Sequence, residues 1–178
     1  ILDEPTAVLT PQESEALYEI MQRMAKEKHS IIFITHKMKE VMALSHRITV
    51  LSRGKVMATV QKNETNPETL ADLMLGNLEA KDLMDVSELL QETVVIEKEK
   101  VGSAIQSQTK NQAKLIAVLK DIHAANDLGH PALKGISLEI NSGEILGMAG
   151  VSGNGQPELT DVLSGLRQST QGLYLFEG

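Results

Sequence analysis

Two acidic residues follow the short apolar stretch at the start of the chain, which reads Ile1-Leu2-Asp3-Glu4. A carboxylate at the end of a buried parallel strand can hold Mg²⁺, often through water, so Asp3 is a candidate metal ligand. A second carboxylate beside it, that of Glu4, could polarise a water molecule that attacks the γ-phosphate of a nucleotide. Without further context, an Asp-Glu pair before a turn is more often part of a solvated loop.

A histidine follows the next apolar run, Ser30 to Thr35. If the two strands are parallel neighbours, His36 reaches the same edge of the sheet as the two acids, where it could contact the γ-phosphate and sense its loss. A lone histidine after a strand is more often structural or solvated. The other histidines have no comparable context, and we assign no role to His29, His46, His123 and His130.

A glycine-rich loop near the end of the chain, GVSGNGQP, has the spacing of a phosphate-binding loop, G-x-x-x-x-G. Such a loop holds phosphates and Mg²⁺ with backbone N–H groups, a lysine and a hydroxyl side chain. Here Gln156 carries no charge, and Pro157 lacks both the hydroxyl and a backbone N–H. Taken alone, such a loop is more often a strand-to-helix turn without a ligand. In the context of the other motifs, we favour a degenerate nucleotide site that binds weakly and hydrolyses poorly. The candidate binding residues are Gly150, Val151, Ser152, Gly153, Asn154, Gly155 and Gln156.

The surrounding pattern predicts the elements that position these residues. Thr10, Pro11 and Glu13 have the spacing of a capping box at the start of a helix, and the apolar run 30–35 suits a strand buried on both faces. Residues 79–112 lack a clear pattern and read as a linker. The other expected elements are short helices at 37–44 and 66–76, a hairpin from 47–51 and 56–60, strands at 133–140 and 144–149, and a helix through Leu159, Val162, Leu163 and Leu166.

Composition limits the classes of function. The 178 residues carry a formal charge of −7, which gives no general basic surface for nucleic acid. The absence of cysteine excludes disulfides, thiolate metal sites and cysteine nucleophiles. With only two Tyr and two Phe, the core must be aliphatic. Both ends read as cuts within a longer protein, because the chain starts inside an apolar run and stops after a strand.

Three segments resemble one known family in their order and spacing. The sequence DEPTAVLT at 3–10 resembles the Walker B motif and D-loop of ABC-type ATPases, FITH at 33–36 resembles their switch-histidine strand, and RITVLSRGK at 47–55 resembles the following hairpin. This resemblance covers roughly residues 1–78. It implies that Asp3 binds Mg²⁺, Glu4 is the water-activating base and His36 is the γ-phosphate switch. It also implies a loop that meets a partner ATPase domain, formed by Ala7, Val8, Leu9 and Thr10.

Residues 113–178 resemble the start of the same kind of domain, because LKGISLEINSGEI at 133–145 is similar to the strands that lead into a Walker A loop. The resemblance implies the end of one ABC ATPase domain at 1–78, a linker at 79–112 and the start of a second domain at 113–178. The expected fold class is α/β, with partial P-loop NTPase domains: parallel core strands with helices, plus an antiparallel subdomain at the start of the second domain. Since neither part has a full sheet, we expect exposed apolar strand edges.

The fuller resemblance is to the ATP-binding subunit of simple-sugar and nucleoside importers, whose second loop often reads G-x-x-G-N-G-Q, as residues 150–156 do here. It implies ATP and Mg²⁺ as cofactors, and ATP hydrolysis by the parent protein that energises import. The implied partners are membrane permease subunits and, indirectly, a periplasmic or lipoprotein solute-binding protein. The implied location is peripheral, at the cytoplasmic face of the plasma membrane.

Two alternatives remain. The first is a soluble tandem ABC ATPase that acts on ribosomes or DNA, although such chains usually keep both phosphate loops intact. The second is a non-catalytic truncated fragment. The isolated chain lacks the first Walker A loop, both signature loops and the second Walker B motif, so we expect it to be catalytically inactive.

Overall fold

The computed structural model describes residues 1–75, 114–151 and 153–177. The expected linker at 79–112 and Ser152 of the glycine loop lie outside these residues. Within the described residues the fold is mixed α/β, with one sheet of mainly parallel strands and one antiparallel sheet, so the expected class is confirmed at this level.

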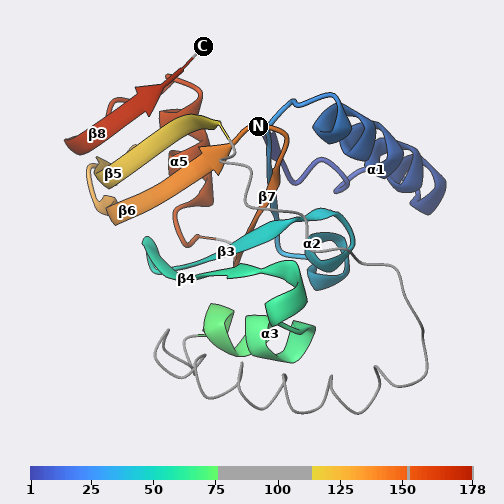
Figure 1. Cartoon of the computed structure of the whole chain (residues 1–178). Helices are drawn as coiled ribbons and strands as arrows, with labels where there is room; N and C mark the ends of the chain where they lie inside the picture. Colours follow the sequence, from blue (N-terminus) through green and yellow to red (C-terminus); the bar gives the residue numbers. More distant parts are fainter. Residues whose placement is uncertain (76–113, 152, 178) are drawn as a thin grey trace.

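The central sheet has five strands in the order β1-β2-β7-β3-β4 (Figure 1). The first four run parallel to their neighbours, and β4 pairs antiparallel with β3 as the predicted hairpin. The bounds are β1 Leu2–Asp3, β2 Ile31–Thr35, β7 Ile145–Gly150, β3 Arg47–Ser52 and β4 Lys55–Gln61.

Strand β7 comes from the later part of the sequence but lies between two strands of the earlier part. Ile31 pairs with Ile145 on one side, and Ile48 pairs with Gly147 on the other. All six residues of β7 are buried, as expected for a parallel strand covered on both faces and paired at both edges. The expectation of exposed strand edges was therefore wrong for β2 and β3, because β7 pairs with both.

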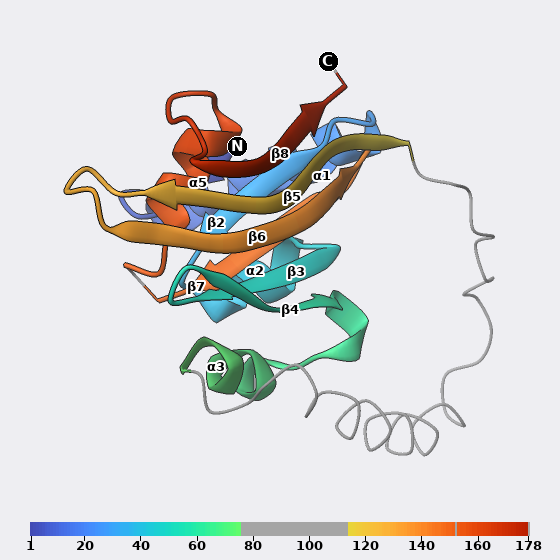
Figure 2. The same ribbon diagram turned by 90° about the vertical axis from the view of Figure 1, so that its left-hand side faces the viewer.

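The second sheet is antiparallel, in the order β6-β5-β8, and lies with helix α5 on one side of the central sheet (Figures 1 and 2). Its core is continuous with that of the central sheet, because Ile34 of β2 and Met148 of β7 belong to the same buried cluster as Ile136 and Leu159. The bounds are β5 Leu115–Ala125, β6 Pro131–Asn141, α5 Gln156–Leu163 and β8 Gln171–Phe176.

Helices cover the opposite face of the central sheet (Figures 1 and 2). Met21 of α1 packs with Phe33 of β2, and Leu70 of α3 packs with Ile48 and Val50 of β3. The predicted capping box at Thr10 is confirmed. The bounds are α1 Pro11–Lys26, α2 Met38–Leu44, the 3₁₀ turn η1 Lys62–Glu64 and α3 Pro67–Leu75.

The helix after the glycine loop is shorter than predicted. It ends at Leu163, and Leu166 is 81% exposed instead of continuing the apolar stripe. Gly165 follows with a φ of 75°, a left-handed conformation that ends helices. The periodic apolar pattern therefore ran past the point at which this glycine ends the helix.

The position of β7 can be tested with disulfides, because the chain contains no cysteine. Ile34 and Met148 are register partners with side chains in one buried cluster. Neighbouring strands lie about 4.8 Å apart, within the range that a disulfide spans. We expect the variant with Ile34→Cys and Met148→Cys to form a disulfide on mild oxidation, measured by counting free thiols in denaturant.

The matched control combines Ile34→Cys with Ala149→Cys. Successive residues of a strand point to opposite faces, so this pair should stay reduced. Equal oxidation of the two variants, or none in the first while its circular dichroism matches the parent chain, would contradict the pairing of β2 with β7.

Candidate functional site

The pairing of β1 with β2 brings the first acidic pair and the histidine together. Asp3 is the register partner of Ile34, so the residues that follow both strands meet at one edge of the sheet. Glu4 Oε1 lies 2.6 Å from His36 Nδ1, and their side chains are 40% and 50% exposed. The predicted parallel neighbours are therefore confirmed. An exposed pair of this kind contributes only about 0–1 kcal/mol to stability.

The backbone at Glu4 is held in a tight turn. Its φ of 42° is left-handed, which is uncommon for a residue with a side chain. The Glu4 N–H donates to the Ile34 carbonyl at 2.9 Å, and the Glu4 carbonyl accepts from the Ala7 N–H at 3.0 Å. A non-glycine residue in this conformation costs about 1–3 kcal/mol and tends to occur at functional sites. The turn therefore sets the direction of the Glu4 carboxylate.

The glycine loop reaches the same edge because β7 lies beside β2. A pocket of about 360 Å³ lies between the acids and the loop. Its lining contains two carboxylates and no cationic side chain, which is unfavourable for a bare phosphate. The lining residues are Asp3, Glu4, Ile34, Thr35, Gly153, Gln156 and Pro157.

Gln156 folds back into its own loop. Its side-chain oxygen accepts from the Asn154 N–H at 3.1 Å, and its side-chain nitrogen donates to the Val151 carbonyl at 3.0 Å. The side chain is buried against Gly150, where an added Cβ would approach Gln156 Nε2 to 2.4 Å. In an intact phosphate-binding loop, a backbone N–H such as that of Asn154 would donate to a phosphate oxygen. Here it donates to the Gln156 side chain instead.

Asn154 fastens the loop to the β3–β4 hairpin. Its side-chain oxygen accepts from the Arg53 N–H at 2.6 Å, and its carbonyl accepts from the Gly54 N–H at 3.1 Å. Gly54 has no room for a side chain, because an added Cβ would lie 1.9 Å from the Ala132 carbonyl oxygen. The glycine loop, the hairpin and β6 therefore form one rigid contact.

Asp3 is the best candidate for a cation ligand. Burial raises the pKa of its carboxyl group, as do the neighbouring Glu4 and Asp161, while a hydrogen bond from Thr160 lowers it. The Thr160 hydroxyl lies 3.5 Å from Asp3 Oδ2 and also donates to the Gln156 carbonyl at 3.0 Å. A divalent cation would relieve the repulsion between these carboxylates, and Mg²⁺ typically uses one or two protein carboxylates plus water and phosphate. The acidic pair therefore fits Mg²⁺.

The glycine loop fits a nucleotide poorly. Pro157 stands in the first turn of α5 and offers neither a hydroxyl nor an N–H. Within the described residues, no three or more His, Cys, Asp or Glu side chains are grouped so that they could hold a metal ion. The structure thus brings Asp3 and Glu4 to one pocket with Gly153 and Gln156, and His36 joins this site through its contact with Glu4.

The expected D-loop residues lie away from this pocket. Val8 is 91% exposed, and Ala7 is also exposed. Thr10 caps α1, accepting from the Glu13 N–H at 3.3 Å. Leu9 is half-buried, and its N–H donates to the Thr6 carbonyl at 3.3 Å. The exposed tip of the loop, at Ala7 and Val8, is therefore available to contact another surface. The capping box at Thr10 holds the other end of the loop in place.

A buried polar cluster beside the site escaped the sequence analysis. Glu40 is 7% exposed, and its carboxylate accepts from Thr6 at 2.6 Å and from Thr35 at 3.1 Å. Lys37 Nζ lies 3.2 Å from the same carboxylate and donates to the Thr6 hydroxyl at 3.0 Å. The cluster joins the turn after Glu4 to the strand end before His36. The sequence did carry one signal of this cluster: Lys37 and Glu40 are three positions apart at the start of a short predicted helix, a spacing that allows an ion pair, and Thr35 lies just before them.

The cluster keeps Glu40 ionised. Burial alone would raise the pKa of Glu40, but hydrogen bonds from Thr6, Lys37 and Thr35 together bring it below the ordinary value. Burial and the nearby Glu40 carboxylate raise the pKa of Tyr18 to about 12, so this phenol stays protonated. A buried charge with several donors holds its neighbours in one arrangement.

The chain is similar in sequence to ATP-binding subunits of importers. A glucose import ATP-binding protein of Haloferax volcanii is 37% identical over 178 residues, which is all of this chain and 28% of the relative. A nucleoside import ATP-binding protein of Lactococcus lactis is 37% identical over 172 residues, 97% of this chain and 30% of the relative. A guanosine import ATP-binding protein of Bacillus subtilis is 35% identical over 178 residues, 100% of this chain and 31% of the relative.

The chain belongs to the ABC-type import ATP-binding proteins and corresponds to a segment of such an ATPase. It spans only 28–31% of the length of these relatives. The family resemblance expected from the sequence is thereby confirmed. No protein-family model matches the chain.

The Glu40 cluster predicts a pH effect on stability. Because the folded-state pKa of Glu40 lies below its ordinary value of 4.5, its contribution is present above that value and is lost as the pH falls through the lowered pKa. We expect Glu40→Gln to lower the free energy of unfolding by about 1–3 kcal/mol at pH 7 and to flatten its acid dependence. Urea unfolding at pH 7 and at a series of pH values below 4.5 measures both effects.

The control for this prediction is Glu19→Gln, on the exposed face of α1. It removes the same charge without a buried contact and should leave both quantities nearly unchanged. An equal effect of the two substitutions would show that net charge, not the buried cluster, sets the acid sensitivity.

Proposed function

We propose that the chain is part of an ATPase subunit that binds and hydrolyses ATP to energise import of a simple sugar or nucleoside through a membrane permease. The observation that carries this proposal is the similarity along nearly the whole chain to import ATP-binding proteins named for glucose, nucleosides and guanosine. The same observation favours import over action on ribosomes or DNA, because these relatives are import proteins.

The acidic pair and the histidine are proposed to act at a hydrolytic site. Asp3 would hold Mg²⁺, Glu4 would accept the proton of the attacking water, and His36 would sense the γ-phosphate. Bound Mg²⁺ would supply positive charge to the phosphate oxygens. The 2.6 Å contact between Glu4 and His36 supports this assignment, because it couples the proposed base to the proposed sensor. Ala7, Val8, Leu9 and Thr10 would meet a partner ATPase domain.

The glycine loop is proposed as a degenerate nucleotide site. A phosphate would have to displace the Gln156 side chain from the Asn154 N–H, and it would gain no lysine in return. Charge-assisted bonds are roughly twice as strong as neutral ones, so the exchange is unfavourable. The loop is therefore a weak binder at best and acts mainly as a structural contact between β7, α5 and the β3–β4 hairpin.

The division into two ATPase domains remains a proposal for the parent. In it, residues 1–78 end the first domain, 79–112 link the domains and 113–178 begin the second. A complete first domain would supply its own phosphate-loop strand for the place that β7 takes here. The Asp3–Glu4 site would then face an intact loop, while residues 150–156 would serve the second site.

The proposed setting is the cytoplasmic face of the plasma membrane, with permease subunits as direct partners and a solute-binding protein as an indirect one. Nucleic acid is not a proposed partner, given the formal charge of −7. None of the helices in the described ranges is long and apolar enough to cross a bilayer.

The isolated 178-residue chain is expected to show no ATP hydrolysis above background. No cationic side chain lines its pocket at the acidic pair, and the Gln156 side chain fills its glycine loop. Phosphate release from the purified chain with ATP and Mg²⁺ tests this. Turnover that disappears on Glu4→Gln would show that the chain is a complete catalyst and that this part of the proposal is wrong.

Substitutions in the full-length parent can distinguish the roles of the two proposed sites. Glu4→Gln should abolish transport-coupled hydrolysis, because it removes the proposed base. Gln156→Ala should have a much smaller effect, because the loop contributes little charge stabilisation. Hydrolysis and solute uptake in reconstituted vesicles measure both, and an equal loss in the two variants would refute the functional asymmetry.

A further inference from the structure

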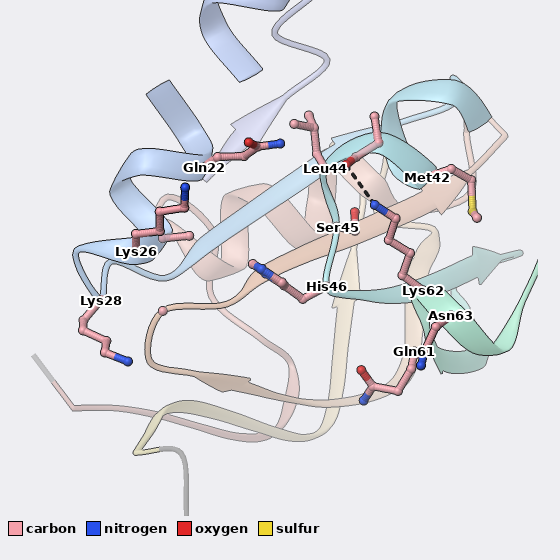
Figure 3. Close-up of a pocket in the computed structure, with 13 residues that line it drawn as sticks. Gln22, Lys26, Lys28, Met42, Leu44, Ser45, His46, Gln61, Lys62 and Asn63 are labelled. Carbon is pink, nitrogen blue, oxygen red and sulfur yellow. Dashed lines mark hydrogen bonds between the residues drawn. The ribbon is translucent and has the colours of Figure 1, made fainter. Parts of the chain in front are cut away.

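A large pocket lies at the opposite end of the central sheet from the acidic pair. Its volume is about 930 Å³, and it is formed by the ends of α1 and α2, the turn before β7 and the end of β4 (Figure 3). In open α/β sheets, ligands of the main site bind at the carboxyl ends of the strands. This pocket lies at the amino ends of β3 and β7, so it is separate from the site described above.

The walls of the pocket are positive. Its lining includes three lysines, Lys26, Lys28 and Lys62, and no acidic residue, although the whole chain has a formal charge of −7. Figure 3 shows Lys26 and Lys28 on one wall and Lys62 on the opposite wall. In the described part of the chain, the ammonium groups of Lys26 and Lys28 have no hydrogen bond or ion pair. Lys62 donates to the Ala43 carbonyl at 3.0 Å.

His46 adds a directed donor between these walls (Figure 3). Its Nδ1 lies 2.9 Å from the backbone nitrogen of Ile145. A backbone N–H can only donate, so Nδ1 must accept, and the ring proton lies on Nε2. That N–H has no partner within the described residues. The amide side chains of Gln22, Gln61 and Asn63 offer further donors around the rim.

The floor of the pocket is apolar. Met42 is half-buried, Leu44 and Ala25 are buried, and all three line the cavity. Gly143 closes one side, where an added Cβ would lie 3.1 Å from the Ala25 carbonyl oxygen. The pocket therefore combines an apolar surface with a cationic and hydrogen-bonding rim. This combination suits a ligand with an anionic group and an apolar part.

We propose that this pocket is a second binding site, which takes a small phosphate-bearing molecule with an apolar or aromatic moiety. The phosphate oxygens accept from Lys26, Lys28 and the His46 Nε2–H, and the apolar part lies against Met42 and Leu44. The site joins α1, α2 and β4 at the starts of β3 and β7. Occupancy thus stabilises the packing that holds β7 in the sheet, by an amount that grows with ligand concentration.

Titration calorimetry at low salt tests the proposal with phenyl phosphate, inorganic phosphate and phenol as probes. Phenyl phosphate should bind more tightly than inorganic phosphate, and phenol should not bind measurably. Replacing Lys26, Lys28 and Lys62 together by Gln should weaken phenyl phosphate binding by about tenfold or more, because the substitutions remove the positive charges that attract the phosphate.

The charge-matched control replaces Lys39, Lys55 and Lys120 by Gln. These three lysines do not line the pocket, so their replacement should leave binding unchanged. Equal weakening in both variants would overturn the site and indicate general charge attraction. Ala43→Trp, on an exposed position that lines the pocket, should block binding sterically while keeping every lysine. Full binding by this variant, with unchanged circular dichroism, would also overturn the proposal.

Two further experiments test where the ligand binds and whether its phosphate comes from a small molecule or from a lipid. Glu4→Gln and Gln156→Ala should leave phenyl phosphate binding unchanged. Tighter binding in either variant would place the ligand at the other end of the sheet, because each substitution removes a group that opposes a phosphate there. Vesicles of phosphatidylglycerol test a lipid headgroup as the source of phosphate. Lysine-dependent binding to vesicles, with none to phenyl phosphate, would overturn a small-molecule site in favour of a membrane contact.

Discussion

The insertion of β7 between β2 and β3 determines most of what the molecule contains. Without it, two buried apolar strands would expose their backbone N–H and C=O groups along facing edges, at a cost that few folds tolerate. With it, Ile34 and Met148 pack into a core shared with the antiparallel sheet, while Phe33 and Ile145 pack against α1. The same insertion carries the glycine loop to the acidic pair, so packing and site geometry have one cause.

The glycine loop satisfies its polar groups from within the chain. A nest of backbone N–H groups needs acceptors, and Gln156 supplies one from within the chain. The side-chain oxygen and the carbonyl of Asn154 accept from the β3–β4 hairpin, while its side-chain nitrogen donates to the Val151 carbonyl within the loop. The glycines are still required, because Gly150 makes room for Gln156 and Gly155 opens α5 in a left-handed conformation. Glycine spacing alone therefore does not distinguish a phosphate site from a turn that satisfies itself.

Local signals predicted local structure well. The capping box of α1, the β3–β4 hairpin and the apolar runs of β2 and β7 depend on residues close in sequence, and each lies where its pattern indicated. The pairing of β7 with β2 and β3, about a hundred positions earlier, could not be predicted, because nothing in an apolar strand specifies which strand it pairs with. Glu40 was missed for the related reason that its donor Thr6, 34 positions earlier, is brought to it only by the fold.

The late position of β7 also sets the order in which the chain can fold. Ser30 and Asn141, which hydrogen-bond beside the start of the strand pair, are 111 positions apart. At a synthesis rate of roughly 5–20 residues per second, β2 and β3 leave the ribosome several seconds before the strand that separates them. During that interval their apolar edges are open to chaperones or to another copy's β7. Among the strand pairings of the described residues, that of the six-residue β7 with β2 spans the greatest separation in sequence, and pairing over such a distance is intrinsically slow.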